Sequence, residues 1–190
     1  MTALNPVARI EPQLTDVMRL HLDMSPKQAR ERVLHLLREV HMRDPARVLR
    51  QYPHQLSGGM RQRVCIAIAF ACNPKLVIAD EPTTALDVTV QKQILRLIRE
   101  MQALNNTAVL FISHDLGVVA KVCSRVSVLH AGRVVEHSDA ASLFAQPRHE
   151  YTRALLAATP RYDRPGEALQ PVSAELQERL QREAIVFDGH

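Results

Sequence analysis

The sequence lacks any long run of apolar residues. Its longest uncharged apolar stretch runs only from Val64 to Cys72, far short of the ~20 residues that a membrane-spanning helix needs. The first six residues contain no basic region followed by an apolar stretch, so they predict no secretory signal. These two absences exclude a membrane-embedded chain and favour a folded protein that works in the cytoplasm.

Cysteine and aromatic residues are also scarce. The three cysteines, Cys65, Cys72 and Cys123, have no short paired spacing of the kind that zinc and redox motifs require. Aromatic residues make up 4% of the chain, tryptophan is absent, and the net charge of +4 comes from scattered arginines. Nucleic-acid binding usually needs a basic stripe with stacking aromatics, so we expect no nucleic-acid partner.

Glycine is the scarcity that matters most for function. The chain has six glycines, and none of them can form the G-x-x-x-x-G-K-[ST] loop that cradles nucleotide phosphates. The residues present therefore exclude a phosphate-binding loop of this kind within the chain.

Patterns of apolar residues predict helices in the first part of the chain and alternating strands and helices after it. Ser25, Pro26 and Gln28 form a capping box at a helix start. Short apolar runs over 76–80 and 107–112 predict strands buried on both faces. The other expected elements are helices over 60–72, 89–104, 116–123, 149–158 and 173–184 and a hairpin over 126–130 and 133–135. Strands that alternate with helices indicate an α/β fold with a parallel sheet.

The segment 56–63, Leu-Ser-Gly-Gly-Met-Arg-Gln-Arg, places a hydroxyl and two glycines at a helix N-terminus. Backbone N–H groups and the helix dipole favour a phosphate at such a position. The alternative reading is an ordinary helix cap formed by Ser57.

Two carboxylates, Asp80 and Glu81, stand at the end of the first predicted strand. Ligands bind at the carboxyl edge of parallel sheets, and there one acid can hold Mg²⁺ while the other orients a water. A surface pair of acids before Pro82 is the alternative. The segments 84–87 and 113–115 follow, and the second of them places His114 at the same predicted edge.

Taken together, these segments resemble the ATP-binding subunits of ABC transporters. The signature motif matches 56–60, Walker B matches 76–80 with the adjacent Glu81, the D-loop matches 84–87 and the H-loop matches His114. The opening residues and the segment 148–156 resemble the importers of oligopeptides and dipeptides. Met60 stands where many ABC signatures have glutamine, as is familiar in the peptide branch.

The resemblance implies roles for these residues. Asp80 would hold Mg²⁺ through water, Glu81 would polarise the attacking water and His114 would contact the γ-phosphate of ATP. Ser57, Gly58 and Gly59 would close over ATP held by a partner subunit, and Met60 and Asp87 are also expected to bind nucleotide. The implied fold is a parallel-sheet nucleotide-hydrolase core, here incomplete, with a helical subdomain at 1–54 that faces the permease, core segments at 55–146 and a C-terminal helical extension at 147–190.

The resemblance also implies ATP and Mg²⁺ as cofactors and an ATPase subunit on the cytoplasmic face of the inner membrane. Its expected partners are membrane permease subunits, a second ATPase subunit and, indirectly, a substrate-binding protein. Because Walker A would lie before Met1, we expect an N-terminally truncated subunit that is inactive alone and lacks a strand inside its core sheet. The alternatives are a non-enzymatic remnant that docks on a permease or an intact ATPase, and an ABC-type ATPase of DNA maintenance, which the tail at 148–156 disfavours.

Overall fold

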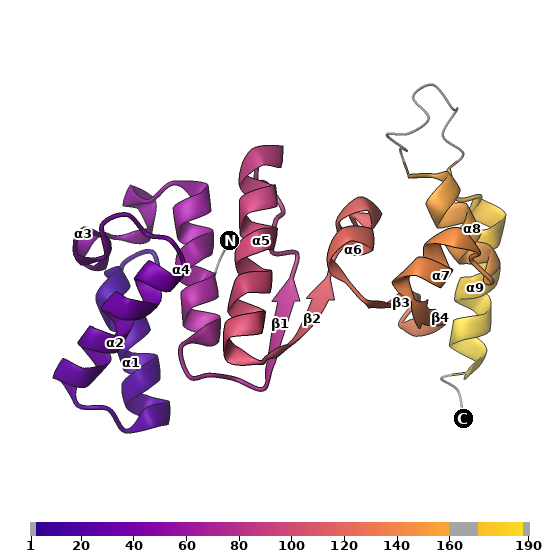
Figure 1. Cartoon of the computed structure of the whole chain (residues 1–190). Helices are drawn as coiled ribbons and strands as arrows, with labels where there is room; N and C mark the ends of the chain where they lie inside the picture. The colour runs from indigo at the N-terminus through magenta and orange to yellow at the C-terminus, as the bar shows by residue number, and fades with distance from the viewer. Residues whose placement is uncertain (1–2, 160–170, 188–190) are drawn as a thin grey trace. The chain divides into compact units, whose positions relative to one another are not determined.

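A computed structural model describes residues 3–159 and 171–187, with side chains of the last helix described as far as residue 183. The chain divides into two compact units, with the boundary after Ile112 (Figure 1). None of the helices in the described residues is long and apolar enough to cross a membrane.

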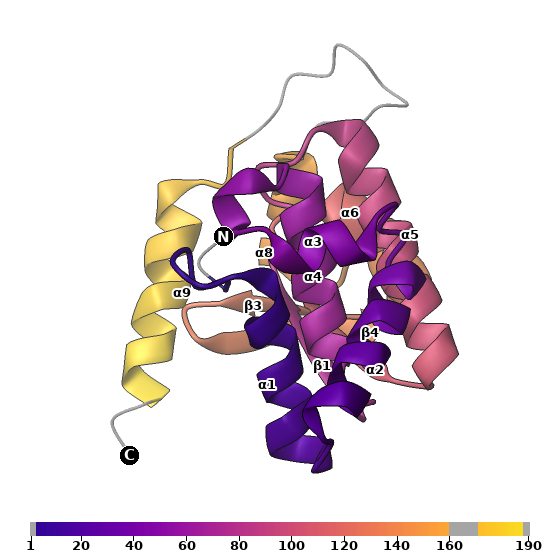
Figure 2. The ribbon, with the colours of Figure 1, turned by 90° about the vertical axis from the view of Figure 1, so that its left-hand side faces the viewer.

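The first unit begins with a group of helices, onto which Figure 2 looks. Ser25 and Gln28 form the predicted capping box: Ser25 Oγ accepts the Gln28 N–H at 3.4 Å, and Gln28 Oε1 accepts the Ser25 N–H at 3.0 Å. Apolar residues at helical spacing then bury one face of each helix, and Leu14, Leu36 and Phe70 are among the fully buried ones. The helical elements are α1 (Ile10–Leu22), α2 (Pro26–Glu39), α3 (Pro45–Arg50), the 3-10 turn η1 (Pro53–Gln55) and α4 (Gly58–Phe70).

A two-stranded parallel sheet follows α4. Strand β1 (Leu76–Asp80) pairs with β2 (Ala108–Ile112) along its whole length, and α5 (Val88–Asn105) connects them. The predicted bounds of β1 are confirmed, and β2 begins one residue later than expected. The side chain of Thr107 instead donates to the Pro74 carbonyl at 2.7 Å. This is the strand, helix, strand order that a parallel pair requires.

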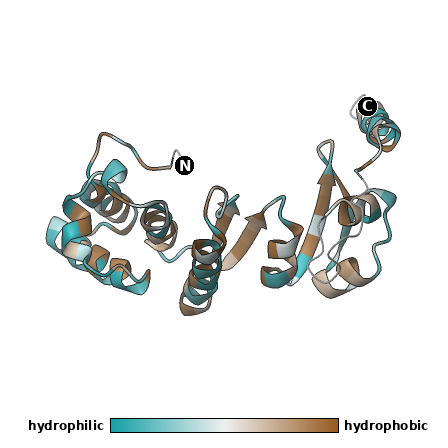
Figure 3. Ribbon diagram, turned by 90° about the horizontal axis from the view of Figure 1, so that it is seen from above, coloured by the Kyte–Doolittle hydropathy of each residue, from teal (hydrophilic) through white to brown (hydrophobic). Residues whose placement is uncertain are grey.

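The prediction that these strands are buried on both faces is wrong. Val77, Val109 and Phe111 pack against the core of the first unit. The alternate residues on the other face, Leu76, Ile78, Leu110 and Ile112, are 45% to 61% exposed. Both strands carry apolar residues along most of their length (Figure 3), but within the first unit only one side of the sheet packs against the core.

The second unit contains the predicted hairpin. Strand β3 (Arg125–His130) pairs with β4 (Arg133–Asp139) in antiparallel register, and Ala131 and Gly132 turn between them with positive φ angles of 46° and 76°. Strand β4 is longer than expected and ends at Asp139. Asp139 is also the N-cap of a helix that the sequence analysis did not predict. The helices of the second unit are α6 (Leu116–Val122), α7 (Ala140–Ala145), α8 (Glu150–Ala157) and α9 (Ala174–Phe187).

The four described strands form two separate sheets, β1 with β2 and β3 with β4. A parallel sheet of only two described strands agrees with the expectation of an incomplete parallel core. The predicted domain borders after residues 54 and 146 remain predictions.

Candidate functional site

The signature segment opens helix α4. Ser57 is its N-cap, with extended backbone angles, and its Oγ accepts the Met60 N–H at 3.3 Å. The first turn of a helix offers N–H groups that have no acceptor inside the helix. Since Ser57 satisfies the third of these groups, the amides of Gly58 and Gly59 remain as donors at the positive end of the helix dipole. The Ser57 cap and a phosphate at the two glycines would use different backbone amides, so the two interpretations are compatible.

The fold brings the signature beside the start of α5. A Cβ added at Gly59 would lie 2.9 Å from Cγ1 of Val90, and a β-branched side chain in a helix has little freedom to move away. Asp87 is the N-cap of α5, and its Oδ1 accepts the Val90 N–H at 2.9 Å. Gly59 and Asp87, two of the predicted nucleotide contacts, thus both adjoin Val90.

The two adjacent acids at the end of β1 have different surroundings. Asp80 ends the strand and is exposed, and strand alternation places it on the open face with Leu76 and Ile78. Glu81 has a positive φ of 45° and donates its N–H to the Ile112 carbonyl at 3.0 Å. One of its carboxylate oxygens accepts the Thr84 hydroxyl at 2.7 Å. Glu81 is therefore held in a left-handed turn, while Asp80 is still part of the strand.

The turn after Glu81 contains two threonines to which the sequence analysis gave no individual role, although Thr84 opens the predicted D-loop. Thr84 binds the Glu81 carboxylate, and Thr83 is buried and accepts a hydrogen bond from Gln91 Nε2 at 3.3 Å. Ala85 also has a positive φ, of 64°. The adjacent threonines after Pro82 were a usable signal, because threonine hydroxyls commonly bond to nearby groups in turns.

Asp80 could bind a magnesium ion only as one of several ligands of that ion. The described residues contain no group of three or more histidine, cysteine, aspartate or glutamate side chains that could hold a metal. Mg²⁺ is usually bound through one or two carboxylates together with substrate phosphates and waters. A single exposed carboxylate at the end of β1 suits that mode.

His114 lies in the second unit and is exposed, just before α6. Its neighbours have structural roles: Asp115 caps α6 by accepting the Val118 N–H at 3.1 Å, and the Asp115 N–H donates to Ser113 Oγ at 3.0 Å. The roles of His114 and of the other predicted site residues remain predictions.

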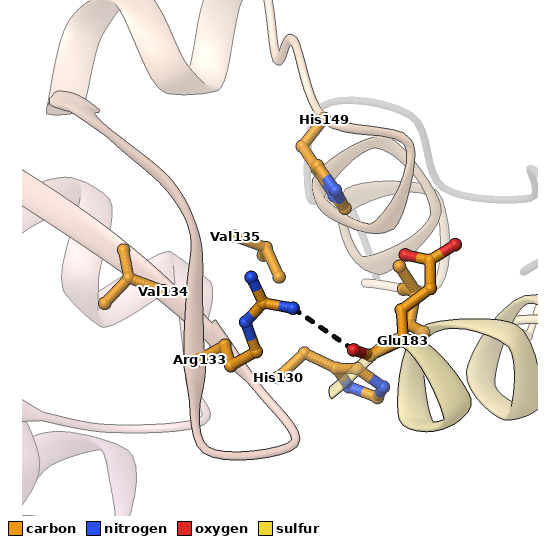
Figure 4. Close-up of a pocket in the computed structure, with 7 residues that line it drawn as sticks. His130, Arg133, Val134, Val135, His149 and Glu183 are labelled. Carbon is orange, nitrogen blue, oxygen red and sulfur yellow. Dashed lines mark hydrogen bonds between the residues drawn. The ribbon is translucent and has the colours of Figure 1, made fainter. Parts of the chain in front are cut away.

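The second unit also has a small cavity beside its hairpin (Figure 4). His130, Arg133, His149 and Glu183 line it, and Arg133 Nη1 donates to the Glu183 carbonyl at 3.4 Å. Its volume is about 210 Å³, below the ~300 Å³ at which ligand pockets begin. None of the predicted site residues lines it.

Two of the cysteines lie in or just after helix α4. Burial raises the pKa of the Cys65 and Cys72 thiols above the usual cysteine range. A thiol with a raised pKa is a poor nucleophile and metal ligand. This agrees with the absence of a zinc or redox spacing around these two residues in the sequence.

The arrangement of signature, Walker B strand and D-loop matches known families. The family model described as ABC transporter matches residues 3–84, and the model described as oligopeptide/dipeptide transporter, C-terminal region, matches residues 135–184. The chain belongs to the ABC transporter family.

Several curated ATP-binding proteins are similar to this chain over most of its length. The chain is 51% identical to the dipeptide transport ATP-binding protein DppD of Bacillus subtilis, over 90% of this chain and 51% of that protein. It is 50% identical to the oligopeptide transport ATP-binding protein OppD of Escherichia coli, over 89% of this chain and 50% of that protein. The chain thus spans about half the length of the curated relatives it matches.

Solved ABC cassettes share the fold. A dimeric post-hydrolysis state of the ATP-binding cassette MJ0796 bound to ADP and Pi matches with a TM-score of 0.61 and 29% identity, over 72% of this chain and 59% of that one. A second dimeric structure of this bacterial ABC transporter cassette matches with a TM-score of 0.58. The predicted fold class and the predicted resemblance to the peptide branch are both confirmed.

Proposed function

We propose that this chain supplies the signature-bearing part of an ATP-binding subunit in an importer of oligopeptides or dipeptides. The observation that carries the proposal is the start of α4, where Ser57 caps the helix and leaves the Gly58 and Gly59 amides as donors. Relatives named as dipeptide and oligopeptide transport ATP-binding proteins support the branch and the substrate class.

The proposed roles divide between two nucleotide contacts. Residues around the starts of α4 and α5 would contact an ATP held by a second subunit, because helix amides favour phosphate oxygens; they are Ser57, Gly58, Gly59, Met60 and Asp87. Asp80 would hold Mg²⁺, which when bound neutralises charge on the phosphates. Glu81 would orient a water and accept its proton, and His114 would contact the γ-phosphate.

Hydrolysis by the chain alone should be close to zero. A phosphate-binding loop is absent from its 190 residues, and losing one well-placed charge-stabilising donor already costs about 3 kcal/mol, or 10²-fold or more in rate. We therefore propose that ATP turnover requires a Walker A sequence in addition to the residues described.

The proposed partners are membrane permease subunits, a second ATPase subunit and, indirectly, a substrate-binding protein, at the cytoplasmic face of the membrane. The helical region at 1–54 would face the permease. The dimeric state of the solved cassettes supports the subunit pairing.

A second candidate is a non-enzymatic remnant that at most docks on a permease or an intact ATPase. The exposed apolar face of the β1–β2 sheet favours it, since an open face of this kind destabilises the folded state and promotes aggregation.

The test is ATP-dependent capture of an intact relative whose hydrolysis is blocked. The chain should bind it only with ATP present, and Gly58→Asp should abolish the binding because a carboxylate would face phosphate. Gly132→Asp, in the hairpin turn of the second unit, is the matched control and should leave capture unchanged. Binding that ignores both ATP and Gly58→Asp would reject the signature role and favour simple docking.

A further inference from the structure

The side chain of Arg63 joins three helices of the first unit. It extends from α4, and its two terminal nitrogens donate to different neighbours. Nη1 donates to the Val40 carbonyl at the end of α2, at 2.9 Å, and Nη2 donates to Gln93 Oε1 on α5, at 3.2 Å. A guanidinium group is planar and always charged, so two such bonds fix its direction as well as its distance. Arg63 therefore ties α4 to both other helices.

The end of α2 leaves a free acceptor for a charged donor. His41 follows the C-cap of this helix with a positive φ of 57°. The His41 N–H donates to the Arg38 carbonyl at 2.9 Å, and the Met42 N–H donates back to the Leu37 carbonyl at 2.9 Å. These two bonds form a Schellman motif, which satisfies two of the last carbonyls of the helix. The Val40 carbonyl lies at the negative end of the helix dipole, where a cation from another helix is favoured.

A second contact between α4 and α5 lies one turn away from Arg63. Gly59 stands four residues before Arg63 on α4, and Val90 stands three residues before Gln93 on α5, so each pair shares a face of its helix. A Cβ added at Gly59 would lie 2.9 Å from Cγ1 of Val90. The two helices therefore meet at a close apolar contact beside the signature and at a polar contact one turn later. Two contacts on one face determine the direction in which the start of α4 points.

This direction matters for the proposed contact with ATP. The free amides of Gly58 and Gly59 point along the axis of α4, and hydrogen bonds weaken steeply when the donor is misaligned. A tilt or rotation of α4 would thus move both amides away from a phosphate. Asp87 is the N-cap of α5, so a fixed contact between the two helices also fixes Asp87 relative to the two glycines.

We propose that Arg63 is a positioning residue for the signature. It sets the angle at which α4 presents Gly58 and Gly59 to the ATP of a second subunit, and it acts through the Val40 carbonyl and Gln93 without contacting the nucleotide. This inference rests on the proposed function of the signature and adds to it a residue outside the motif's phosphate-facing end.

The experiment measures the ATP concentration that gives half-maximal capture of the intact, hydrolysis-blocked relative by the full 190-residue chain. Arg63→Met keeps an unbranched apolar side chain but removes both donors, and it should raise this concentration at least tenfold. Arg63→Lys should recover part of the loss, because an ammonium group can donate to the Val40 carbonyl but lacks the fork that reaches two acceptors.

A double-mutant cycle tests whether Arg63 acts through its partner on α5. Gln93→Leu removes one of the two acceptors and should raise the half-maximal ATP concentration by a smaller factor than Arg63→Met. Added to Arg63→Met, it should have no further effect, since the two residues share one interaction.

Two controls separate positioning from stability. Val33→Ala, at a fully buried side chain on α2, should lower the urea midpoint because it leaves a cavity, yet it should leave the half-maximal ATP concentration unchanged. Arg32→Met removes an arginine that bonds to His35 and Glu39 of its own helix, and it should also leave that concentration unchanged.

The outcomes distinguish this inference from the proposed function. If Arg63→Met is captured at the same ATP concentration as the unchanged chain, or if Val33→Ala shifts that concentration equally, Arg63 does not position the signature. Additive effects of Arg63→Met and Gln93→Leu would also overturn the proposal. Failure of the unchanged chain to be captured with ATP would instead reject the function of the signature itself, and the role of Arg63 with it.

Discussion

The helices of the first unit and its sheet make opposite use of apolar residues. In α1, α2 and α4 the large apolar side chains find partners within the same unit, and Leu14, Leu36 and Phe70 are fully buried. In β1 and β2 only every second residue is covered, and Ile78 and Leu110 remain more than half exposed. Both regions have the composition of a protein core, but only the helices form one within the residues described.

The difference follows from what a helix and a parallel sheet each need in order to bury their apolar residues. An amphipathic helix needs one apolar neighbour, which another helix of the same short segment can supply. A parallel sheet needs two layers and further strands, which come from distant parts of a chain. Within the first unit, the helices therefore bury their apolar faces against one another, whereas the sheet packs against the core on one face only.

The largest predicted effect is a loss of stability in the helical core of the first unit. Phe70→Ala should lower the free energy of unfolding by about 3–5 kcal/mol, because it leaves a cavity at a side chain that is 1% exposed. Ile78→Thr, on the open sheet face, should change it by no more than ~0.5 kcal/mol. Urea unfolding followed by circular dichroism measures both. Comparable losses would mean that the open face is packed in solution.

The next effect concerns the chemistry at the end of the sheet. In an assembly that supplies Walker A, Glu81→Gln should reduce ATP hydrolysis 10²-fold or more and leave ATP binding largely intact, because an amide cannot accept the water's proton. Asp80→Asn should instead weaken the Mg²⁺ dependence. Steady-state turnover and nucleotide titration separate the two. Mild, equal losses would show that these roles are assigned wrongly.

A smaller effect is expected at α5, the helix that joins the two strands. Asp87→Ala removes the cap of the Val90 N–H and should cost about 1 kcal/mol of stability. Asp87→Asn should keep most of the cap. Thermal unfolding of the chain without nucleotide is the measurement. If the alanine and asparagine variants unfold alike, Asp87 does not act as a cap.

The smallest effect concerns the contact between the end of α2 and α5. The side-chain hydrogen bond from His41, at 2.8 Å, and that from Arg96 lower the pKa of Glu100 below the usual glutamate range. A lowered carboxylate pKa adds stability above the ordinary value of ~4.3, and this stability is lost as the pH falls through the folded pKa. His41→Ala should raise the pKa of Glu100 toward the ordinary value. An NMR titration in which the Glu100 midpoint did not move would contradict the contact.

Much of the molecule was determined by local sequence. Ser25 and Gln28 specify a helix start because their capping hydrogen bonds lie within one turn, and 76–80 specifies a strand because its run of apolar residues ends at Asp80. The order of signature, Walker B and D-loop also identified the family. Tertiary structure alone decided that Gly59 lies against Val90, that Thr84 holds the Glu81 carboxylate and that one face of the sheet stays open. These features depend on how distant segments pack, whereas an apolar strand looks the same in sequence with one covered face or two.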